Sequence, residues 1–210
     1  MENQQHLMRL DLLSNAAVET LSPSFNHLPT TSHKDGKYRL RRYSQIQLGS
    51  KSMEILASDT FEQGHDYNDF QGGIKRKFEN IENSTIHSDG MKELIFLFKA
   101  VNSLPLGTKV DIHQMRVITL NLDTQVSPEG VHRDGYDYIS MIGISRYNIA
   151  GGHLLVYTDK DSDHFLSIPL CAGQVVTLDD RRLWHNASPI QAIDQQKTGH
   201  MDAFILTARL

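Results

Sequence analysis

Cysteine, long apolar runs and excess charge of one sign are all scarce in this sequence of 210 residues. The single cysteine, Cys171, excludes an internal disulfide framework and fits a reducing compartment, so a cytoplasmic protein is expected. No stretch approaches about 20 consecutive apolar residues, which excludes a membrane-spanning helix. Near the N-terminus, Glu2, Arg9 and Asp11 interrupt the apolar run that a signal peptide would need.

The charge balance disfavours a nucleic-acid partner, because the net charge is -4 and the isoelectric point is near 6.2. Hydrophobic residues make up 39% of the chain, enough for a sizeable core. We therefore expect one domain over residues 1–210, in which a mixed helix and strand part, 1–104, packs on a β-rich part, 105–210. A small molecule is the expected partner, and the sequence assigns no oligomeric state.

The pattern of apolar residues changes character along the chain. Residues 8–21 and 91–104 have spacing closer to the helical period and predict two amphipathic helices, while 37–48 alternates as a strand. From Val110 to the C-terminus, short β-rich runs follow one another with turn residues between them. Closely spaced strands without intervening helices predict an antiparallel sandwich or barrel.

The stretch PEGVHRDGYDY, residues 128–138, places His132 and Asp134 two residues apart after a turn signal. On a strand, that spacing aims an imidazole and a carboxylate at one point. A third ligand would complete the two-histidine, one-carboxylate set of non-haem Fe(II) sites. His185 in LWHNASPI is the candidate, since the 51 residues from Asp134 let several strands return beside the pair. The alternatives are a solvated turn for the pair and a half-buried structural histidine for His185.

Several separated motifs then resemble one family. VDIHQMRV, PEGVHRDGYDY, SRYNIAGGHLLVY and LDDRRLWHNASPI resemble the bacterial 2-oxoglutarate and Fe(II) dependent dioxygenases that include isoleucine dioxygenase and related hydroxylases of free amino acids. The resemblance implies a double-stranded β-helix (a jelly roll, mainly β with flanking helices) and Fe(II) held by His132, Asp134 and His185. It further implies 2-oxoglutarate and O2 as co-reactants, hydroxylation of an unactivated C–H bond of a free L-amino acid, and release of succinate and CO2.

One position departs from the family pattern. The family carries an arginine on the last strand that grips the distal carboxylate of 2-oxoglutarate, but in GHMDAFILTARL the matching residue is Met201. A methionine cannot replace a charge-assisted bidentate contact. Another cation could substitute, with Arg116, Arg146 and Arg209 as candidates, and Tyr157 could add a hydrogen bond unless it is a core tyrosine. The alternative function is a jelly roll that binds a metal or ligand without catalysis, or that uses another oxoacid.

Two further groups of residues carry predictions. Arg39, Arg41 and Arg42 with Tyr43 could bind a substrate carboxylate, Arg42 and Tyr43 being the candidates we single out; the alternative is an exposed basic face of an edge strand. The turn DDRR, residues 179–182, is expected to hold the strand of His185 through a hydrogen-bond network.

Overall fold

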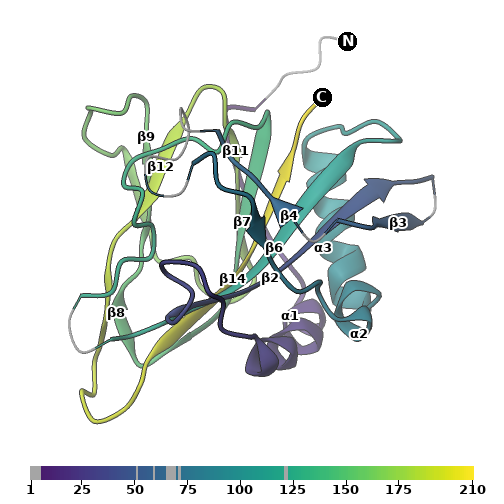
Figure 1. Cartoon of the computed structure of the whole chain (residues 1–210). Helices are drawn as coiled ribbons and strands as arrows, with labels where there is room; N and C mark the ends of the chain where they lie inside the picture. The colour runs from purple at the N-terminus through teal and green to yellow at the C-terminus, as the bar shows by residue number, and fades with distance from the viewer. Residues whose placement is uncertain (1–5, 51, 59, 65–69, 71, 121–122) are drawn as a thin grey trace.

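A seven-stranded antiparallel sheet forms the middle layer of the computed structural model, which describes residues 6–50, 52–58, 60–64, 70, 72–120 and 123–210 (Figure 1). Its strands, in spatial order, are β1 (Met8–Leu12), β11 (Gln174–Asp179), β7 (Tyr138–Tyr147), β14 (His200–Ala208), β6 (Lys109–Ile118), β2 (Arg39–Leu48) and β3 (Met53–Leu56). The strands β2 and β3 come from the N-terminal half of the chain, so that half extends the sheet built by the C-terminal half.

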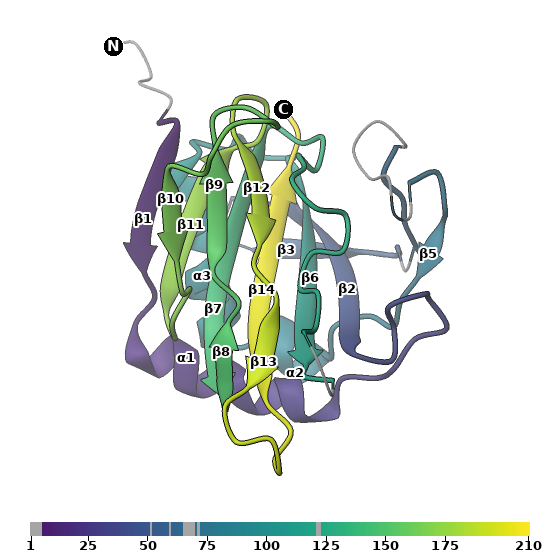
Figure 2. The same cartoon turned by 90° about the vertical axis from the view of Figure 1, so that its left-hand side faces the viewer.

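A smaller layer of strands lies over one face of this sheet (Figure 2). It consists of β10 (Leu166–Ile168), β9 (Leu154–Tyr157) and β12 (Trp184–Ala187), continued by the pair β13 (Ile190–Ala192) and β8 (Ile149–Gly151). The two layers enclose an apolar interior that includes Val156, Leu178 and Ile190. This is the predicted jelly roll, mainly β with flanking helices.

Helices cover the opposite face of the large sheet. The elements are α1 (Asn15–Leu21), a 3-10 turn (Ser22–His27), α2 (Asn83–Ile86) and α3 (Asp89–Val101), while β4 (Thr60–Phe61) and β5 (Arg76–Lys77) form a separate hairpin. Ser14 and Ser88 cap α1 and α3, each accepting a backbone N–H in the first turn. None of the helices within the described residues is long and apolar enough to cross a membrane.

The helix predicted over residues 8–21 is wrong in its first half. Residues Met8–Leu12 form β1, which pairs antiparallel with β11 at the edge of the sheet, and only Asn15–Leu21 is helical. Leu10 and Leu12 are 53% and 72% exposed, so their alternation with polar residues serves an edge strand rather than a buried helix face. The strand predicted at 37–48 and the helix predicted at 91–104 correspond to β2 and α3.

Alternation along the central strands divides their side chains between two environments. On β2, Leu40, Ile46 and Leu48 pack into the core beneath the helices, whereas Arg39 and Arg41 face the space between the layers. On β14, Phe204 and Leu206 join the same core, while Met201 and Ala203 face inward. The inner face of the large sheet is therefore one wall of a cavity.

Candidate metal centre and cavity

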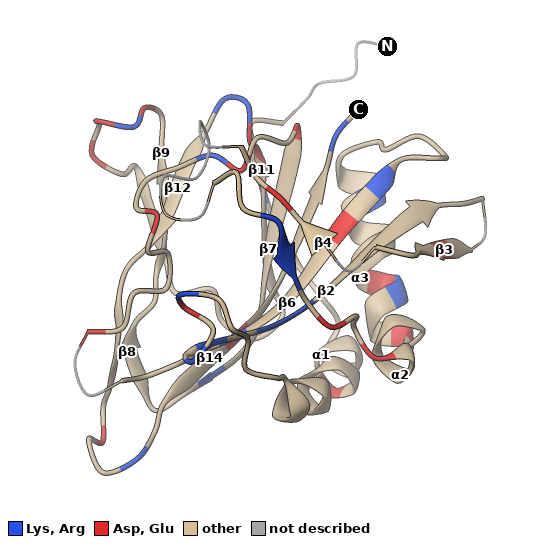
Figure 3. Ribbon diagram, viewed as in Figure 1, with Lys and Arg blue, Asp and Glu red and all other residues tan. Residues whose placement is uncertain are grey.

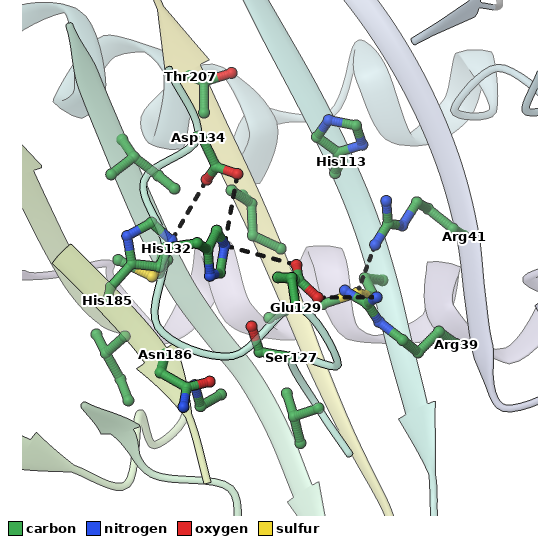
Figure 4. Close-up of a pocket in the computed structure, with 18 of the residues that line it drawn as sticks. Arg39, Arg41, His113, Ser127, Glu129, His132, Asp134, His185, Asn186 and Thr207 are labelled. Atoms are coloured by element: carbon green, nitrogen blue, oxygen red, sulfur yellow. Dashed lines mark hydrogen bonds and ion pairs between the residues drawn. The ribbon is translucent and has the colours of Figure 1, made fainter. Parts of the chain in front are cut away.

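Three potential metal ligands converge in the lining of this cavity. His185 lies on β12, and His132 lies in the segment between β6 and β7, where it forms an isolated antiparallel bridge with His185. The backbone N–H of each histidine donates to the carbonyl of the other, both at 2.9 Å. Asp134 follows two residues after His132, so the main chain itself brings the three side chains to one place (Figure 4).

The side-chain distances suit a bound metal ion. The Nε2 atom of His132 is 3.7 Å from Asp134 Oδ1, and the Nε2 atom of His185 is 3.4 Å from Asp134 Oδ2. All three ligand atoms lie within 4.8 Å of one another. Metal–ligand bonds of about 2.0–2.2 Å place neighbouring ligand atoms roughly 3 Å apart, so only a small contraction is needed. The donor set fits the arrangement of non-haem Fe(II) sites.

Hydrogen bonds orient His132 and the loop that carries Asp134. The Nδ1 atom of His132 lies 2.8 Å from the carbonyl of Gly130, which leaves its Nε2 atom to face Asp134. The buried Nδ1 atom of His185 has no hydrogen-bond partner and lies 3.8 Å from Asp180 Oδ1. Asp180 accepts backbone N–H bonds from Asp134 and Tyr136, at 3.1 and 3.0 Å. The DDRR turn thus fixes the loop of Asp134, a contact to the metal site that the predicted turn network did not specify.

A second chain of hydrogen bonds reaches Asp134 from the β4–β5 hairpin. The Nε2 group of Gln63 donates to Asp134 Oδ1 at 2.6 Å, and Arg76 Nη2 donates to Gln63 Oε1 at 3.1 Å. The amide therefore orients the carboxylate and connects it to a buried cation.

The electrostatics keep the carboxylate ionised. Burial raises the pKa of Asp134, but the hydrogen bond from His185 and the positive charges of the two histidines outweigh burial, and the pKa lies well below its ordinary value. Burial lowers the pKa of His132, and the neighbouring His185 lowers it further. Burial, followed by Asp134, raises the pKa of Asp180 to about 6. Burial lowers the pKa of His185, but the hydrogen bond and the charge of Asp134 outweigh burial and raise it. Metal binding requires an ionised carboxylate and neutral imidazoles, so it would release a proton from His185.

Buried charge lines the cavity wall opposite the histidines. Arg39 and Arg41 from β2 and Arg76 from β5 all contribute, and both strands stand out as basic in Figure 3. Between these arginines and the histidines lies Glu129, whose Oε1 atom is 3.6 Å from His132 Nε2 and whose Oε2 atom is 3.9 Å from Arg39 Nη1. Figure 4 shows this sequence of charged groups crossing the cavity. Anionic and zwitterionic small molecules fit such a lining.

Comparison with known proteins agrees with the site. The sequence pattern of 2OG-Fe dioxygenases matches residues 22–207. The chain belongs to the 2OG-Fe dioxygenase family. Membership in this family implies Fe(II), 2-oxoglutarate and O2 as cofactor and co-reactants, and the observed two-histidine, one-carboxylate arrangement fits them.

Solved structures share the fold of this 2OG-Fe dioxygenase. A bsmA homologue from Methylobium petroleophilum PM1 matches with a TM-score of 0.80 and 27% identity, over 92% of this chain and 81% of that one. IDO from Bacillus thuringiensis matches with a TM-score of 0.72, 17% identity and the same coverages. The Fe(II)/α-ketoglutarate-dependent dioxygenase TqaL matches with a TM-score of 0.72 and 14% identity, over 97% and 82%. The last two identities support the shared fold alone. A search of curated proteins for sequence relatives found no match.

The cations predicted for cosubstrate binding lie outside the cavity of this dioxygenase. Arg116 points to the helix-covered face and forms a bidentate ion pair with Asp202, at 2.6 and 2.8 Å. Arg146 lies beside Met201 but donates to the carbonyls of Gly151 and Gly152. Arg209 donates to the Gly135 carbonyl. Each guanidinium is thus engaged elsewhere.

The remaining predicted residues are also displaced from the cavity. Tyr157 is paired in register with Trp184 and packs its ring on His164, on the face of the small sheet opposite to that of Val156 and His185. Arg42 faces the helix side and pairs with Glu79 and Glu82 at 2.9 and 3.3 Å, as strand alternation requires. The hydroxyl group of Tyr43 donates to Asp111, and both residues line a second pocket instead of the cavity of the proposed metal ligands.

Sequence reasoning missed several residues that line the cavity near the proposed ligands. Glu129 lies within the motif PEGVHRDG, three residues before His132, and could have been noted there. Gln63 and Arg76 belong to a short hairpin whose position against Asp134 has no sequence signal. Arg41 was considered with Arg39 and Arg42, but only the observed pairing of β2 shows which arginines face inward.

Proposed function

We propose that this 2OG-Fe dioxygenase holds Fe(II) through His132, Asp134 and His185 and hydroxylates a free L-amino acid. The observation that carries the substrate class is Glu129, a carboxylate beside the proposed metal ligands. Its buried Oε2 atom has no hydrogen-bond partner, so it offers an acceptor to a substrate ammonium group. Leaving such an atom without a hydrogen bond is costly, and an ammonium group would supply one.

The substrate carboxylate has matching donors nearby. Arg39 and Arg76 each keep a buried Nε–H group without an acceptor. A carboxylate that enters the cavity could accept from either group. An amino acid whose ammonium group binds Glu129 and whose carboxylate binds an arginine has a fixed orientation. That orientation decides which carbon atom faces the metal.

The protein residues orient the reactants and exclude water. When bound, Fe(II) with 2-oxoglutarate and O2 supplies the oxidation, which yields succinate, CO2 and a hydroxylated C–H position. Asp134 stays ionised through its contacts with His185 and Gln63. Apolar side chains such as Met141, Leu154 and Ile205 line the cavity beside the charged groups and shield it from solvent.

The proposal is tested by incubating the protein with Fe(II), 2-oxoglutarate, O2 and each common L-amino acid, and measuring succinate and a product 16 mass units heavier, that is, one oxygen atom. We expect coupled formation of both for at least one amino acid, abolished by Asp134→Ala. Glu129→Gln keeps the side-chain size and should raise the KM for the amino acid more than it lowers kcat. Hydroxylation confined to compounds without an ammonium group would contradict the substrate class.

The environment of Met201 favours a second candidate, a jelly roll that binds a metal and small ligands without turnover. Met201 is 6% exposed and packs with Met115 and Val126, so its surroundings are apolar. This candidate predicts no succinate above the rate of a metal-free control with any substrate. Stoichiometric hydroxylation of any compound would reject it.

We also propose a reducing, cytoplasmic location. One free, exposed cysteine, Cys171, supports it.

A further inference from the structure

The cosubstrate that the family implies has two carboxylates, and the second poses a problem in this cavity. The first carboxylate and the keto group of 2-oxoglutarate would bind the metal, while the distal carboxylate lies at the other end of the carbon chain. Burying a carboxylate without a cation or hydrogen bonds is strongly unfavourable. The apolar side chains that cluster around Met201 offer neither, and the neighbouring Arg146 donates to the carbonyls of Gly151 and Gly152. The cluster consists of Met115, Val117, Val126, Ile149 and Ile190.

Arg41 is the cavity arginine that lacks an acidic partner. It is 8% exposed, its Nη2 group lies 3.3 Å from the sulfur of Met115, and its Cζ atom lies 5.4 Å from the centre of the Phe78 ring. Across the ranges that the structure describes, no carboxylate lies within ion-pair distance of it. A thioether is a weak acceptor, and within the described residues it is the one hydrogen-bond acceptor of this guanidinium.

The two other cavity arginines already have side-chain partners at a terminal nitrogen atom. Arg39 forms an ion pair with Asp35 at 2.6 Å. Arg76 donates to Gln63 and lies over the ring of Phe61. Burial, followed by the positive charges of Arg39 and Arg76, lowers the pKa of Arg41 to about 9. Arg41 therefore stays protonated at neutral pH, and a bound anion would relieve both its desolvation and its repulsion.

The strand register brings Arg41 toward the position of Met201. Arg41 pairs with Met115 on β6, and Met115 pairs with Ala203 on β14. In the adjacent row, Arg39, Val117 and Met201 pair in the same way. The guanidinium of Arg41 already contacts Met115 on the neighbouring strand. The next residue in this row of paired residues is Ala203, whose small side chain leaves space beside Met115. Figure 4 shows Arg41 directed into the cavity beside Arg39.

We propose that Arg41, supplied by β2, binds the distal carboxylate of 2-oxoglutarate in place of an arginine at position 201 of β14. The proposal rests on the proposed function in one respect, the use of 2-oxoglutarate at this site. A guanidinium fork matches a carboxylate bidentately, so the contact should discriminate between dicarboxylic and monocarboxylic oxoacids.

The experiment is an anaerobic titration of the Fe(II) protein, followed by the visible charge-transfer band that a chelating oxoacid produces. The probes are 2-oxoglutarate and 2-oxopentanoate, which has the same carbon chain without the distal carboxylate. The variants are Arg41→Met, Arg41→Lys and the control Arg42→Met, whose side chain faces the helices. Circular dichroism and bound iron verify that each protein is folded and loaded.

We expect the unmodified protein to bind 2-oxoglutarate about 100-fold more tightly than 2-oxopentanoate, as a charge-assisted bidentate contact allows. Arg41→Met should remove that preference while leaving the affinity for 2-oxopentanoate unchanged, and Arg41→Lys should retain part of it. Arg42→Met should behave like the unmodified protein. Adding Met201→Arg to Arg41→Met should restore the preference.

Three results would overturn the assignment. These are equal affinity for both oxoacids in the unmodified protein, an equal loss for both in Arg41→Met, and no 2-oxoglutarate band despite bound iron. The outcome is independent of amino-acid turnover, because the titration contains no substrate. If Arg41 controls the preference but no amino acid is hydroxylated, the substrate proposal fails and the assignment of Arg41 stands.

Discussion

At the scale of single residues, Asp180 orients the loop of Asp134 but is not itself one of the proposed metal ligands. Its carboxylate accepts the backbone N–H groups of Asp134 and Tyr136. An asparagine at this position offers one oxygen and turns an NH2 group toward the second N–H. We expect Asp180→Asn to weaken Fe(II) binding by about 10–100-fold, the usual effect of losing a residue that orients a ligand.

Anaerobic Fe(II) titration measures this effect. Asp137→Asn is the matched control, because Asp137 is an acid in the same region that interacts with Leu210 and Arg181 instead. Equal losses in the two variants would mean that general destabilisation, and not the orientation of Asp134, is responsible.

His113 is a second single residue with a measurable effect, because it makes the free energy of unfolding depend on pH in the acid range. It is buried among Tyr43, Phe61 and Phe78, and its Nδ1 atom has no hydrogen-bond partner. Burial, then the charges of Arg41 and Arg76, lowers the pKa of His113 well below its ordinary value of 6.5. Below pH 6.5 the unfolded chain binds a proton at this residue that the folded protein does not, so folding stability decreases with falling pH.

We expect His113→Phe to reduce this decrease by up to about 1.4 kcal/mol for each pH unit below 6.5, since it removes one proton from the difference. Urea unfolding of the metal-free protein at several pH values between 7.5 and 5 measures it. Above pH 6.5, His113 contributes no pH dependence to the free energy of unfolding. If the free energies of the unmodified protein and of His113→Phe decreased in parallel below pH 6.5, His113 would not be the cause.

At the scale of elements, the close approach of α1 and α3 depends on one glycine. A Cβ atom at Gly90 would lie 2.6 Å from the carbonyl oxygen of Ala17 and 2.9 Å from Leu21 Cγ. The first contact is with backbone and cannot be relieved by a rotamer change. We expect Gly90→Ala to destabilise the fold by about 1–3 kcal/mol despite the better helix propensity of alanine.

Chemical denaturation measures that loss, and Lys92→Ala on the exposed side of α3 is the control. Fe(II) affinity should stay unchanged in Gly90→Ala, because the helices lie on the face of the large sheet away from the metal ligands. An unchanged free energy of unfolding would show that the helices can separate without cost.

The elements that sequence predicted well are those whose residues have one dominant pattern. The alternation in β2 and the apolar spacing in α3 each fit a single period. Residues 8–21 combine two patterns, since Met8, Leu10 and Leu12 alternate along β1 before the helical spacing begins after Leu13. Reading both as one segment produced the wrong helix.

The residues of the candidate site also differ in how well the sequence predicted them. His132, Asp134 and His185 were predictable from short motifs, and the structure brings them together. The cavity arginines were not, because their role depends on which face of β2 turns inward and on what already pairs with each guanidinium. Arg42 and Arg41 are neighbours in sequence, but only Arg41 lines the cavity.

At the scale of the whole molecule, the proposed metal ligands join segments far apart in the chain. His132 and Asp134 precede β7, and His185 belongs to the small sheet. A ligand that binds only the folded state raises stability by about 2.7 kcal/mol at 100 times its dissociation constant. Anaerobic Fe(II) should therefore raise the melting temperature, and 2-oxoglutarate should raise it further.

Thermal unfolding followed by circular dichroism tests this linkage. His185→Ala should lose most of the Fe(II)-dependent increase, whereas His153→Ala, which changes a histidine outside the cavity, should retain it. The same increase in both variants would place the stabilising metal somewhere other than the proposed site.

The reciprocal backbone hydrogen bonds between His132 and His185 bear on the lifetime of the protein. Since main-chain groups make this pairing, the two imidazoles remain neighbours whether or not an ion lies between them. If iron binds at this site, we expect its loss to leave the two segments joined at this point. We therefore expect an iron-free molecule to bind a new ion at His132 and His185 without refolding.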